Sequence, residues 1–152
     1  MAAKTQYASK GCQKWAQQVV ALAKANLIRG KKIAAGTLYN SVSYTFNPDT
    51  LEIDFFYEDY GEFVESGRRP GRFPPPPAIA KWARIKGLPQ FRDKKGRYIS
   101  NDSRAFLLGR AIARKGIRPF PFFTDAIEDS ITQLTSELEA NLAKDLDNII
   151  EI

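Results

Sequence analysis

The feature that most constrains the fold is a long apolar stripe near the C-terminus. Between residues 124 and 150, large aliphatic side chains recur at steps of three and four, the spacing of one face of an α-helix. About 25 residues in a helix form a rod of roughly 37 Å. We expect Thr124 or Asp125 to cap this helix. Asp147 and Glu151 do not suit its negative end, which predicts fraying unless a partner supplies cations. The stripe consists of Ile127, Ile131, Leu134, Leu138, Leu142, Leu146 and Ile149.

Two further patterns complete the expected framework. A helical period over Ser9–Arg29, ended by Gly30, predicts an N-terminal helix. From residue 41 to residue 57 the period changes to two around the turn 47–50, which predicts a β-hairpin. The expected fold is therefore α+β, with an N-terminal helix and a long C-terminal helix packed on a small antiparallel β-sheet.

Residues 68–117 predict a basic, proline-led helical insertion. Four consecutive prolines, 74–77, exclude a helix or an inner strand and favour a stiff, extended connector. We expect helices over 78–86 and 104–115, the second capped by Asp102 or Ser103, with an exposed loop between them. A chain of 152 residues fits one domain, so residues 1–152 are expected to form a single domain that includes this arm.

Composition restricts the possible chemistry. The chain has no histidine and one cysteine, Cys12, which removes the usual zinc sites, catalytic triads and Cys-His dyads. We expect no enzyme, no catalytic or metal-binding residue and no cofactor. The apolar runs are far shorter than the ~20 residues of a membrane span, and no signal-peptide core is present. Synthesis in the cytoplasm and no membrane partner are expected.

Charge is unevenly distributed along the chain. The overall net charge is +6. Residues 1–67 are neutral, residues 68–118 hold fifteen basic and two acidic residues, and residues 119–152 hold one basic and eight acidic residues. The last two segments therefore carry net charges of +13 and −7. Nucleic acid, the acidic helix of a neighbouring copy, or solvent alone could balance the basic segment.

The order of the motifs resembles a known family. A predicted helix precedes the segment Gly36-Thr37-Leu38-Tyr39-Asn40-Ser41-Val42. The predicted hairpin comes next and is followed by Tyr60-Gly61-Glu62-Phe63-Val64-Glu65-Ser66-Gly67. Later in the chain, Arg118-Pro119-Phe120-Pro121-Phe122-Phe123 leads into the last helix. This ordered set resembles the tail-completion (neck, head–tail joining) proteins of long-tailed bacteriophages. The chain departs from the family pattern at Arg68, where a threonine is frequent, and residues 68–117 are longer than in simple members.

The resemblance implies a structural virion protein, made in the host cytoplasm, that forms a homo-oligomeric ring at the head–tail junction. A hexamer or dodecamer is implied, with the portal or adaptor and the tail tube as partners. Heterologous, head-to-tail contacts can close such a ring. The role of the insertion is not implied by the family.

Two groups of residues are candidates for contacts in such a ring. Glu65 could face an arginine of the next copy or lie on an ordinary surface helix. The prolines of 118–123 predict an edge strand or docking arm, and its phenylalanines are too apolar to stay exposed. Phe120 is expected in the core, while Phe122 and Phe123 could be core or interface. The subunit-interface candidates are Glu65, Arg68, Arg69, Arg118, Phe120, Phe122 and Phe123.

The basic segment also mixes cations with aromatic residues, the materials of a phosphate track. No zinc-finger, homeodomain or RNA-recognition signature is present, so any contact with packaged DNA is expected to be non-specific. Candidates for a DNA-channel or inter-ring contact are Arg92, Lys94, Lys95, Arg97 and Arg104. A monomeric, non-specific nucleic-acid-binding protein is the alternative function.

A metal-dependent nuclease is the enzymatic rival. Seven acids lie between residues 49 and 65. Pro48-Asp49 is present, but the Glu-x-Lys that would complete a nuclease signature is not. Glu52 and Asp54 share one strand face, and we expect that face to be solvated.

Overall fold

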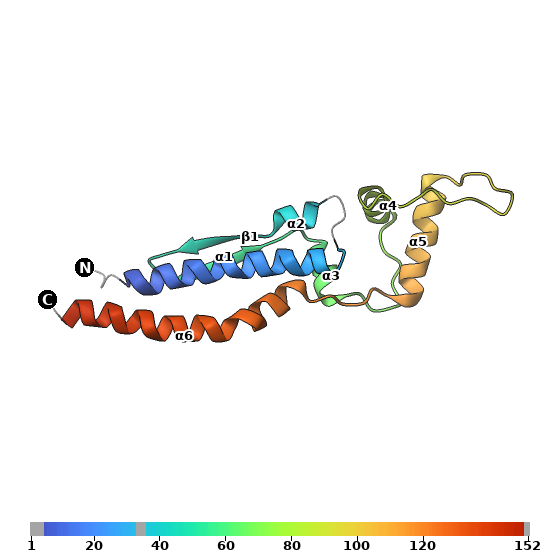
Figure 1. The fold of residues 1–152 in the computed structure, drawn as a ribbon. Helices are drawn as coiled ribbons and strands as arrows, with labels where there is room; N and C mark the ends of the chain where they lie inside the picture. Colours follow the sequence, from blue (N-terminus) through green and yellow to red (C-terminus); the bar gives the residue numbers. More distant parts are fainter. Residues whose placement is uncertain (1–4, 33–35, 151–152) are drawn as a thin grey trace.

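The computed structural model describes residues 5–32 and 36–150 and shows an elongated α+β protein (Figure 1). In chain order the elements are α1 (Gln6–Arg29), α2 (Thr37–Ser41), β1 (Ser43–Asn47), β2 (Glu52–Phe56), α3 (Gly61–Ser66), α4 (Pro76–Ile85), α5 (Asn101–Lys115) and α6 (Phe122–Ile150). We call α1, α2, the hairpin, α3 and α6 the body. The lobe comprises α4, α5 and the loop 88–100 between them. The expected basic helical insertion is this lobe.

Helices α1 and α6 lie side by side and antiparallel along the body (Figure 1). Small residues on the facing surfaces, such as Ala23 and Ala126, are fully buried and let the two backbones approach closely. Two buried polar contacts set the register. The indole of Trp15 donates a 3.0 Å hydrogen bond to Ser130 Oγ, and the Asn26 amide donates one of 3.0 Å to the Phe122 carbonyl.

The N-terminus of α1 is capped by a residue from the far end of the chain. The backbone N–H groups of Tyr7 and Ala8 donate to the Asp145 carboxylate at 3.0 and 2.9 Å. Thr5, the residue that precedes the helix, makes no side-chain cap. Asp145 is buried, and its negative charge lies at the positive end of the α1 dipole. The start of α1 and the end of α6 are therefore held together.

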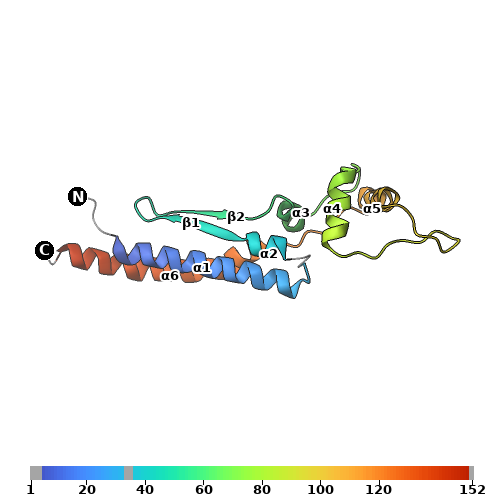
Figure 2. The same ribbon diagram turned by 90° about the horizontal axis from the view of Figure 1, so that it is seen from above.

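The predicted hairpin is confirmed. Strands β1 and β2 pair antiparallel, with Tyr44 opposite Phe55 and Phe46 opposite Ile53. These four side chains lie on the face turned to the helices, and Glu52 and Asp54 are exposed on the other, as the alternation predicts. Figure 2 shows the hairpin along one side of the α1–α6 pair. The ring of Phe55 packs edge-on against Trp15 and Phe123, with centroid separations of 6.0 and 5.2 Å.

Only part of the apolar stripe predicted for the last helix is buried: Ile127 and Leu134 pack against the core, whereas most of the stripe is exposed. Ile131, Leu142, Leu146 and Ile149 are all more than 40% exposed. The buried residues of α6 are Phe122, Ala126, Ser130 and Asp145. The first three recur at steps of four and are offset from the stripe. Ala126 and Ser130 are small, which allows α6 to pack closely against α1. Large aliphatic residues are left beside the contact, where α1 does not cover them.

Several predicted helix ends differ from the observed ones. Helix α1 begins at Gln6, three residues before the prediction, and α6 begins at Phe122 rather than after Thr124 or Asp125. Ser100 caps α5 by accepting a 3.1 Å hydrogen bond from the Ser103 backbone, so the predicted cap at Asp102 or Ser103 is wrong. Helix α4 begins at Pro76, so two of the four prolines that were expected to exclude a helix form its first turn, which the fixed φ of proline suits.

None of the helices in the described part of the chain combines the length and the apolar character that a membrane span requires.

Candidate functional site

The lobe is joined to the body by two short antiparallel segments, residues 67–71 and 113–118, which we call the two-strand link. Arg68 and Ile117 exchange backbone hydrogen bonds of 2.9 and 2.8 Å, and the Gly71 N–H donates to the Ala113 carbonyl at 2.7 Å. Gly67 and Gly116 flank this pairing, and each has a φ of +70°. A positive φ favours glycine, so the link depends on a residue without a side chain at both positions.

A groove of about 500 Å³ lies where α3 of the body meets α4 and α5 of the lobe. Its walls are mainly apolar, because the proline connector, one face of α4 and one face of α5 converge there. Ile79 is buried, whereas Phe63 is 49% exposed and lies open at the groove. The principal apolar lining residues are Phe63, Val64, Pro74, Ile79, Trp82 and Ile112.

The polar residues on the rim of this groove all carry positive charge, apart from Tyr60. No acidic residue of the described chain lines it. The Arg68 guanidinium lies 5.7 Å from the centroid of the Phe63 ring, and the Lys86 ammonium lies 5.2 Å from that of Trp82. Aromatic faces thus hold cations at the edges of the apolar floor. The rim cations are Lys32, Arg68, Lys86 and Arg118.

Glu65, a predicted subunit contact, caps α6 of its own chain. Its carboxylate accepts hydrogen bonds of 2.9 Å from the backbone N–H groups of Phe123 and Thr124, and one from the Thr124 hydroxyl. These N–H groups lie in the first turn of α6, where they have no partner within the helix. Glu65 is half-buried. Its contact with an arginine of another copy stays a prediction.

The phenylalanines of 118–123 divide between the core and its edge. Phe122 is fully buried, and its ring packs edge-on against Tyr57 at 5.5 Å. Phe120 and Phe123 are half-buried and pack against the core, so the expectation of a core position for Phe120 agrees with the structure. Arg118 and Arg69 are exposed.

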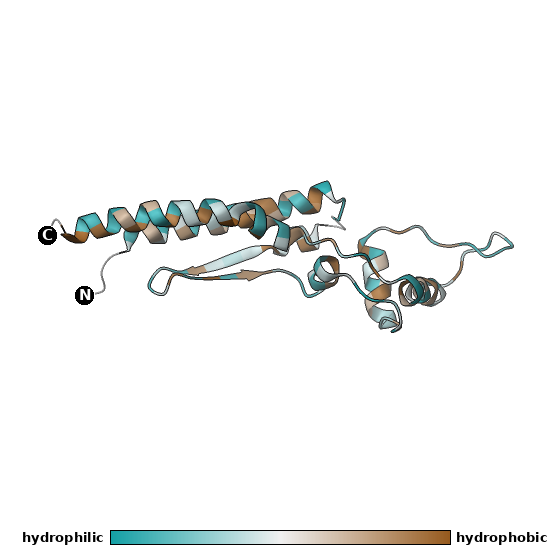
Figure 3. Ribbon diagram, turned by 90° about the horizontal axis from the view of Figure 1, so that it is seen from below, coloured by the Kyte–Doolittle hydropathy of each residue, from teal (hydrophilic) through white to brown (hydrophobic). Residues whose placement is uncertain are grey.

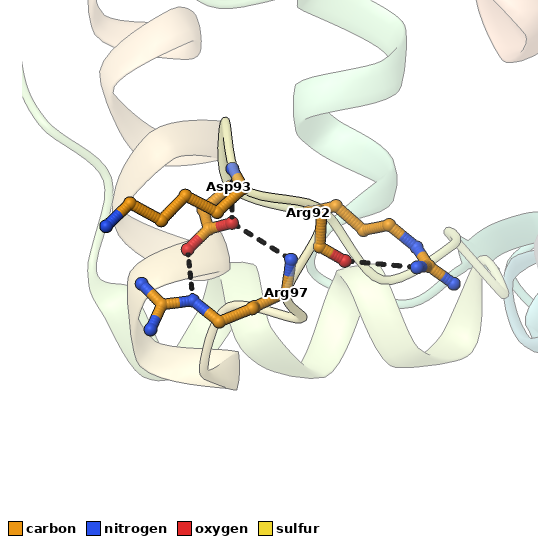
Figure 4. A network of polar contacts seen from close by, with 5 residues as sticks. Arg92, Asp93 and Arg97 are labelled. Carbon is orange, nitrogen blue, oxygen red and sulfur yellow. Dashed lines mark hydrogen bonds and ion pairs between the residues drawn. The ribbon is translucent and has the colours of Figure 1, made fainter.

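The tip of the loop between α4 and α5 is a tight turn built around Asp93 (Figure 4). The Asp93 carboxylate accepts hydrogen bonds from the backbone N–H groups of Lys95 and Arg97, and it pairs with the Arg97 guanidinium at 3.0 Å. These donors hold the pKa of Asp93 below its usual value. The Arg92 guanidinium stacks on Tyr98, 4.2 Å from the ring centroid. Lys94 projects from this turn, and both lysines are exposed.

Arg104 does not belong with these exposed cations. It is 9% exposed and donates hydrogen bonds to the backbone carbonyls of Leu88 and Pro89 at 3.0 and 3.4 Å. The guanidinium therefore satisfies carbonyls at the start of the loop. The expectation that Arg104 contacts DNA or another ring is corrected: its burial assigns it to the interior of the lobe.

The segregated charges of the sequence are not paired within one chain. Within residues 5–32 and 36–150, only two ion pairs form, Lys14 with Glu137 at 3.8 Å and Arg97 with Asp93. Neither joins the basic residues 68–118 to the acidic helix α6. The seven acids of residues 49–65 take part in no group of metal-ligating side chains among the described residues.

Tyr57 has a strongly raised pKa. Burial, a 3.2 Å hydrogen bond from its hydroxyl to Glu62, and the nearby charges of Glu62 and Glu65 raise the pKa of Tyr57 to about 12. The Tyr57 ring packs against Phe122 in the first turn of α6, so the neutral phenol contributes to the packing around Phe122.

The fold and the groove define an elongated α+β protein with an apolar, basic-rimmed groove between two parts of the chain. Comparisons with models of protein families, with characterised proteins and with solved structures find no match.

The groove was not foreseen from the sequence. Its lining comes from four separate segments, which the sequence alone does not bring together. One signal for the groove was present in the sequence. Arg68 and Arg118 stand at the two ends of the basic segment, and the two-strand link brings these ends together.

Proposed function

We propose that this chain is a non-catalytic structural protein of a bacteriophage virion that forms a homo-oligomeric ring at the head–tail junction. The observation that carries the proposal is charge segregation along an elongated molecule. The basic lobe lies at one end, and α6, within a segment of net charge −7, runs away from it along the body (Figure 1). The lobe of one copy and the C-terminal segment of another are therefore complementary in net charge.

Two further observations support this proposal. The described acids of α6 and the cations of residues 68–118 make no ion pairs with each other inside the chain, which leaves the exposed ones, such as Asp147 and Lys94, available to a neighbour. The ordered motifs that resemble tail-completion proteins also lie together in the fold, because Glu65 and the Val64 carbonyl bond the segment 120–124. The portal or adaptor and the tail tube are the proposed partners of the ring.

The loop at the far end of the lobe is proposed to contact packaged DNA without sequence specificity. Lys94 and Lys95 are exposed at its tip, and Arg92 and Arg97 are held beside them. Contacts of this kind weaken as the logarithm of the salt concentration rises. A stable monomer that binds DNA tightly would instead favour the alternative of a nucleic-acid-binding protein.

The decisive experiment is deletion of the gene from the phage that encodes the chain. We expect filled heads and finished tails that do not join, and purified protein added to the lysate should restore infectious particles. Normal infectious particles from the deletion mutant would end the proposal. Metal-dependent cleavage of DNA that is lost in Asp54→Ala would support the nuclease instead.

A further inference from the structure

We infer that the groove between α3 and the lobe binds the C-terminal end of α6 from a second copy of the chain. This inference rests on the proposed function, because it supplies the contact that would build the ring. A groove with an apolar floor and a cationic rim is suited to an amphipathic helix whose apolar face is bordered by acids.

The end of α6 has this chemistry. Leu142, Leu146, Ile149 and Ile150 are 43%, 57%, 44% and 78% exposed, at spacings that place them on one face of the helix. Figure 3 shows hydrophobic and hydrophilic residues alternating along α6 to this end. No described element of the same chain covers these side chains.

The charges at this end of α6 also match the groove. Glu139 and Asp147 are exposed beside the apolar residues, whereas the Lys144 ammonium lies over the Tyr7 ring of its own chain, 5.9 Å from the centroid. Within the described residues, neither of these two acids forms an ion pair. Four cations on the rim of the groove would meet them. A cationic partner also suits the negative end of the α6 dipole.

A chain cannot place this helix end in its own groove. Helix α6 starts next to α3, where Glu65 caps it, and then extends along α1 away from the lobe, as Figures 1 and 2 both show. The groove and the helix end are thus two different surfaces at different places along the molecule. A contact between them is heterologous, and its repetition generates a ring or a filament.

Two variants with matched controls test the contact. Phe63→Glu puts a charge in the groove, and Phe56→Glu changes an equally exposed phenylalanine on β2, outside the groove. Leu146→Asp puts a charge on the helix end, and Ile131→Asp does so on the same stripe of α6, about 22 Å away. We expect both test variants to weaken self-association on the order of 100-fold and both controls to assemble like the wild type. Circular dichroism confirms that each variant is folded.

Mixing the two test variants gives the sharper result. A Phe63→Glu copy keeps an intact helix end, and a Leu146→Asp copy keeps an intact groove. One groove–helix contact can therefore form between the two variants in the mixture, but it cannot be repeated to build a ring or a filament. Light scattering during gel filtration should show each variant alone at the 17.1 kDa of the monomer and the equimolar mixture at twice that mass, with nothing larger.

Three results overturn the inference: wild-type protein that stays monomeric at high concentration, test variants that assemble like the wild type, and a mixture that stays monomeric. Complementation of the deletion phage separates this failure from failure of the proposed function. If Phe63→Glu joins heads to tails as well as the wild type, the groove contact is wrong and the junction role stands. If the wild-type protein itself does not restore joining, the junction role falls.

Discussion

Single carboxylates from distant parts of the chain satisfy the first turns of both long helices. Glu65 caps α6 and Asp145 caps α1, and neither residue belongs to the helix that it caps. Each carboxylate replaces a local cap and ties two segments together with charge-assisted hydrogen bonds. The helix ends and the tertiary structure are therefore stabilised by the same atoms.

Glu65→Ala should lower the free energy of unfolding of the monomer by about 1–2 kcal/mol, because it leaves first-turn N–H groups of α6 without their acceptor. Glu65→Gln, which keeps one carbonyl acceptor, should lose less. Urea denaturation measures both, and Glu52→Ala on the exposed face of β2 is the control. A loss no larger than that of the control would show that Glu65 does not stabilise its own chain.

The pKa of Tyr57 predicts a loss of stability at alkaline pH. The folded value of about 12 lies above the ordinary value of 10.0, so the folded state favours the neutral phenol. This contribution to stability is fully present below pH 10 and is lost as the pH rises through 12. Tyr57→Phe should therefore reduce the fall in Tm across that range. Thermal melts in this pH range test it, and unchanged pH profiles in the two proteins would contradict it.

Little of this residue-scale chemistry could be predicted from the sequence. Rules for helix caps consider the residues just before a helix, and Glu65 lies 58 positions before the Phe123 N–H that it binds. Arg104 was assigned to the surface because it belongs to a basic segment, whereas two backbone carbonyls hold it in the interior. In both cases the partner comes from another segment.

At the scale of elements, the existence of the long helices and the hairpin followed from their periodicity, and the contact face of α6 did not. The hairpin has one apolar face, so alternation alone identifies it. The helix pair packs through small residues instead: Gly11 lies so close to α6 that a Cβ there would come within 2.6 Å of the Asn141 side chain. A search for large apolar residues therefore misses these small contact positions and also selects residues of α6 that stay exposed, such as Leu146.

Gly116→Ala should destabilise the two-strand link. The new Cβ would collide with the Arg68 carbonyl oxygen and lie 3.0 Å from Pro70, at a φ of +70°. We expect a loss of about 1–3 kcal/mol and faster hydrogen exchange at the Arg68 and Ile117 amides.

Gly87→Ala is the matched control for this substitution. Its φ is +63°, but no atom lies within 4 Å of the new Cβ. The control therefore shares the backbone cost, roughly 1 kcal/mol, without the collision. Equal losses in the two variants would show that the close approach in the link does not matter.

At the scale of the whole molecule, the sequence predicted the segregation of charge and not the groove. The net charge of a segment is the sum of the charges of its residues, so it does not depend on how the chain folds. A groove depends on how segments meet, and here residues as distant as Lys32 and Arg118 contribute to one rim. The end of the acidic helix was predicted to need cations from a partner, and the basic rim is where we propose that it finds them.

Self-association should weaken with salt, because the proposed contact pairs opposite charges at a solvent-exposed rim. Between about 0.05 and 0.5 M sodium chloride we expect the association constant to fall at least roughly tenfold. Lys86→Gln, just after the end of α4, should make the dependence on salt shallower, whereas Lys81→Gln, on α4 but outside the groove, should not. Sedimentation equilibrium measures the constants. Association that is insensitive to salt would exclude charge complementarity as its basis.

The pairing of the first long helix with the last also determines when the body can form during synthesis. The face of α1 that packs against α6 is made early, but α6 itself begins at Phe122. At about 5–20 residues per second, a ribosome needs several seconds or more to reach that surface. Throughout this interval the nascent chain leaves Trp15 without Ser130 and Asn26 without the Phe122 carbonyl, their buried hydrogen-bond partners in the finished protein. Chaperones that bind exposed apolar helices should therefore contact this chain co-translationally, and a premature stop before α6 should yield an insoluble product.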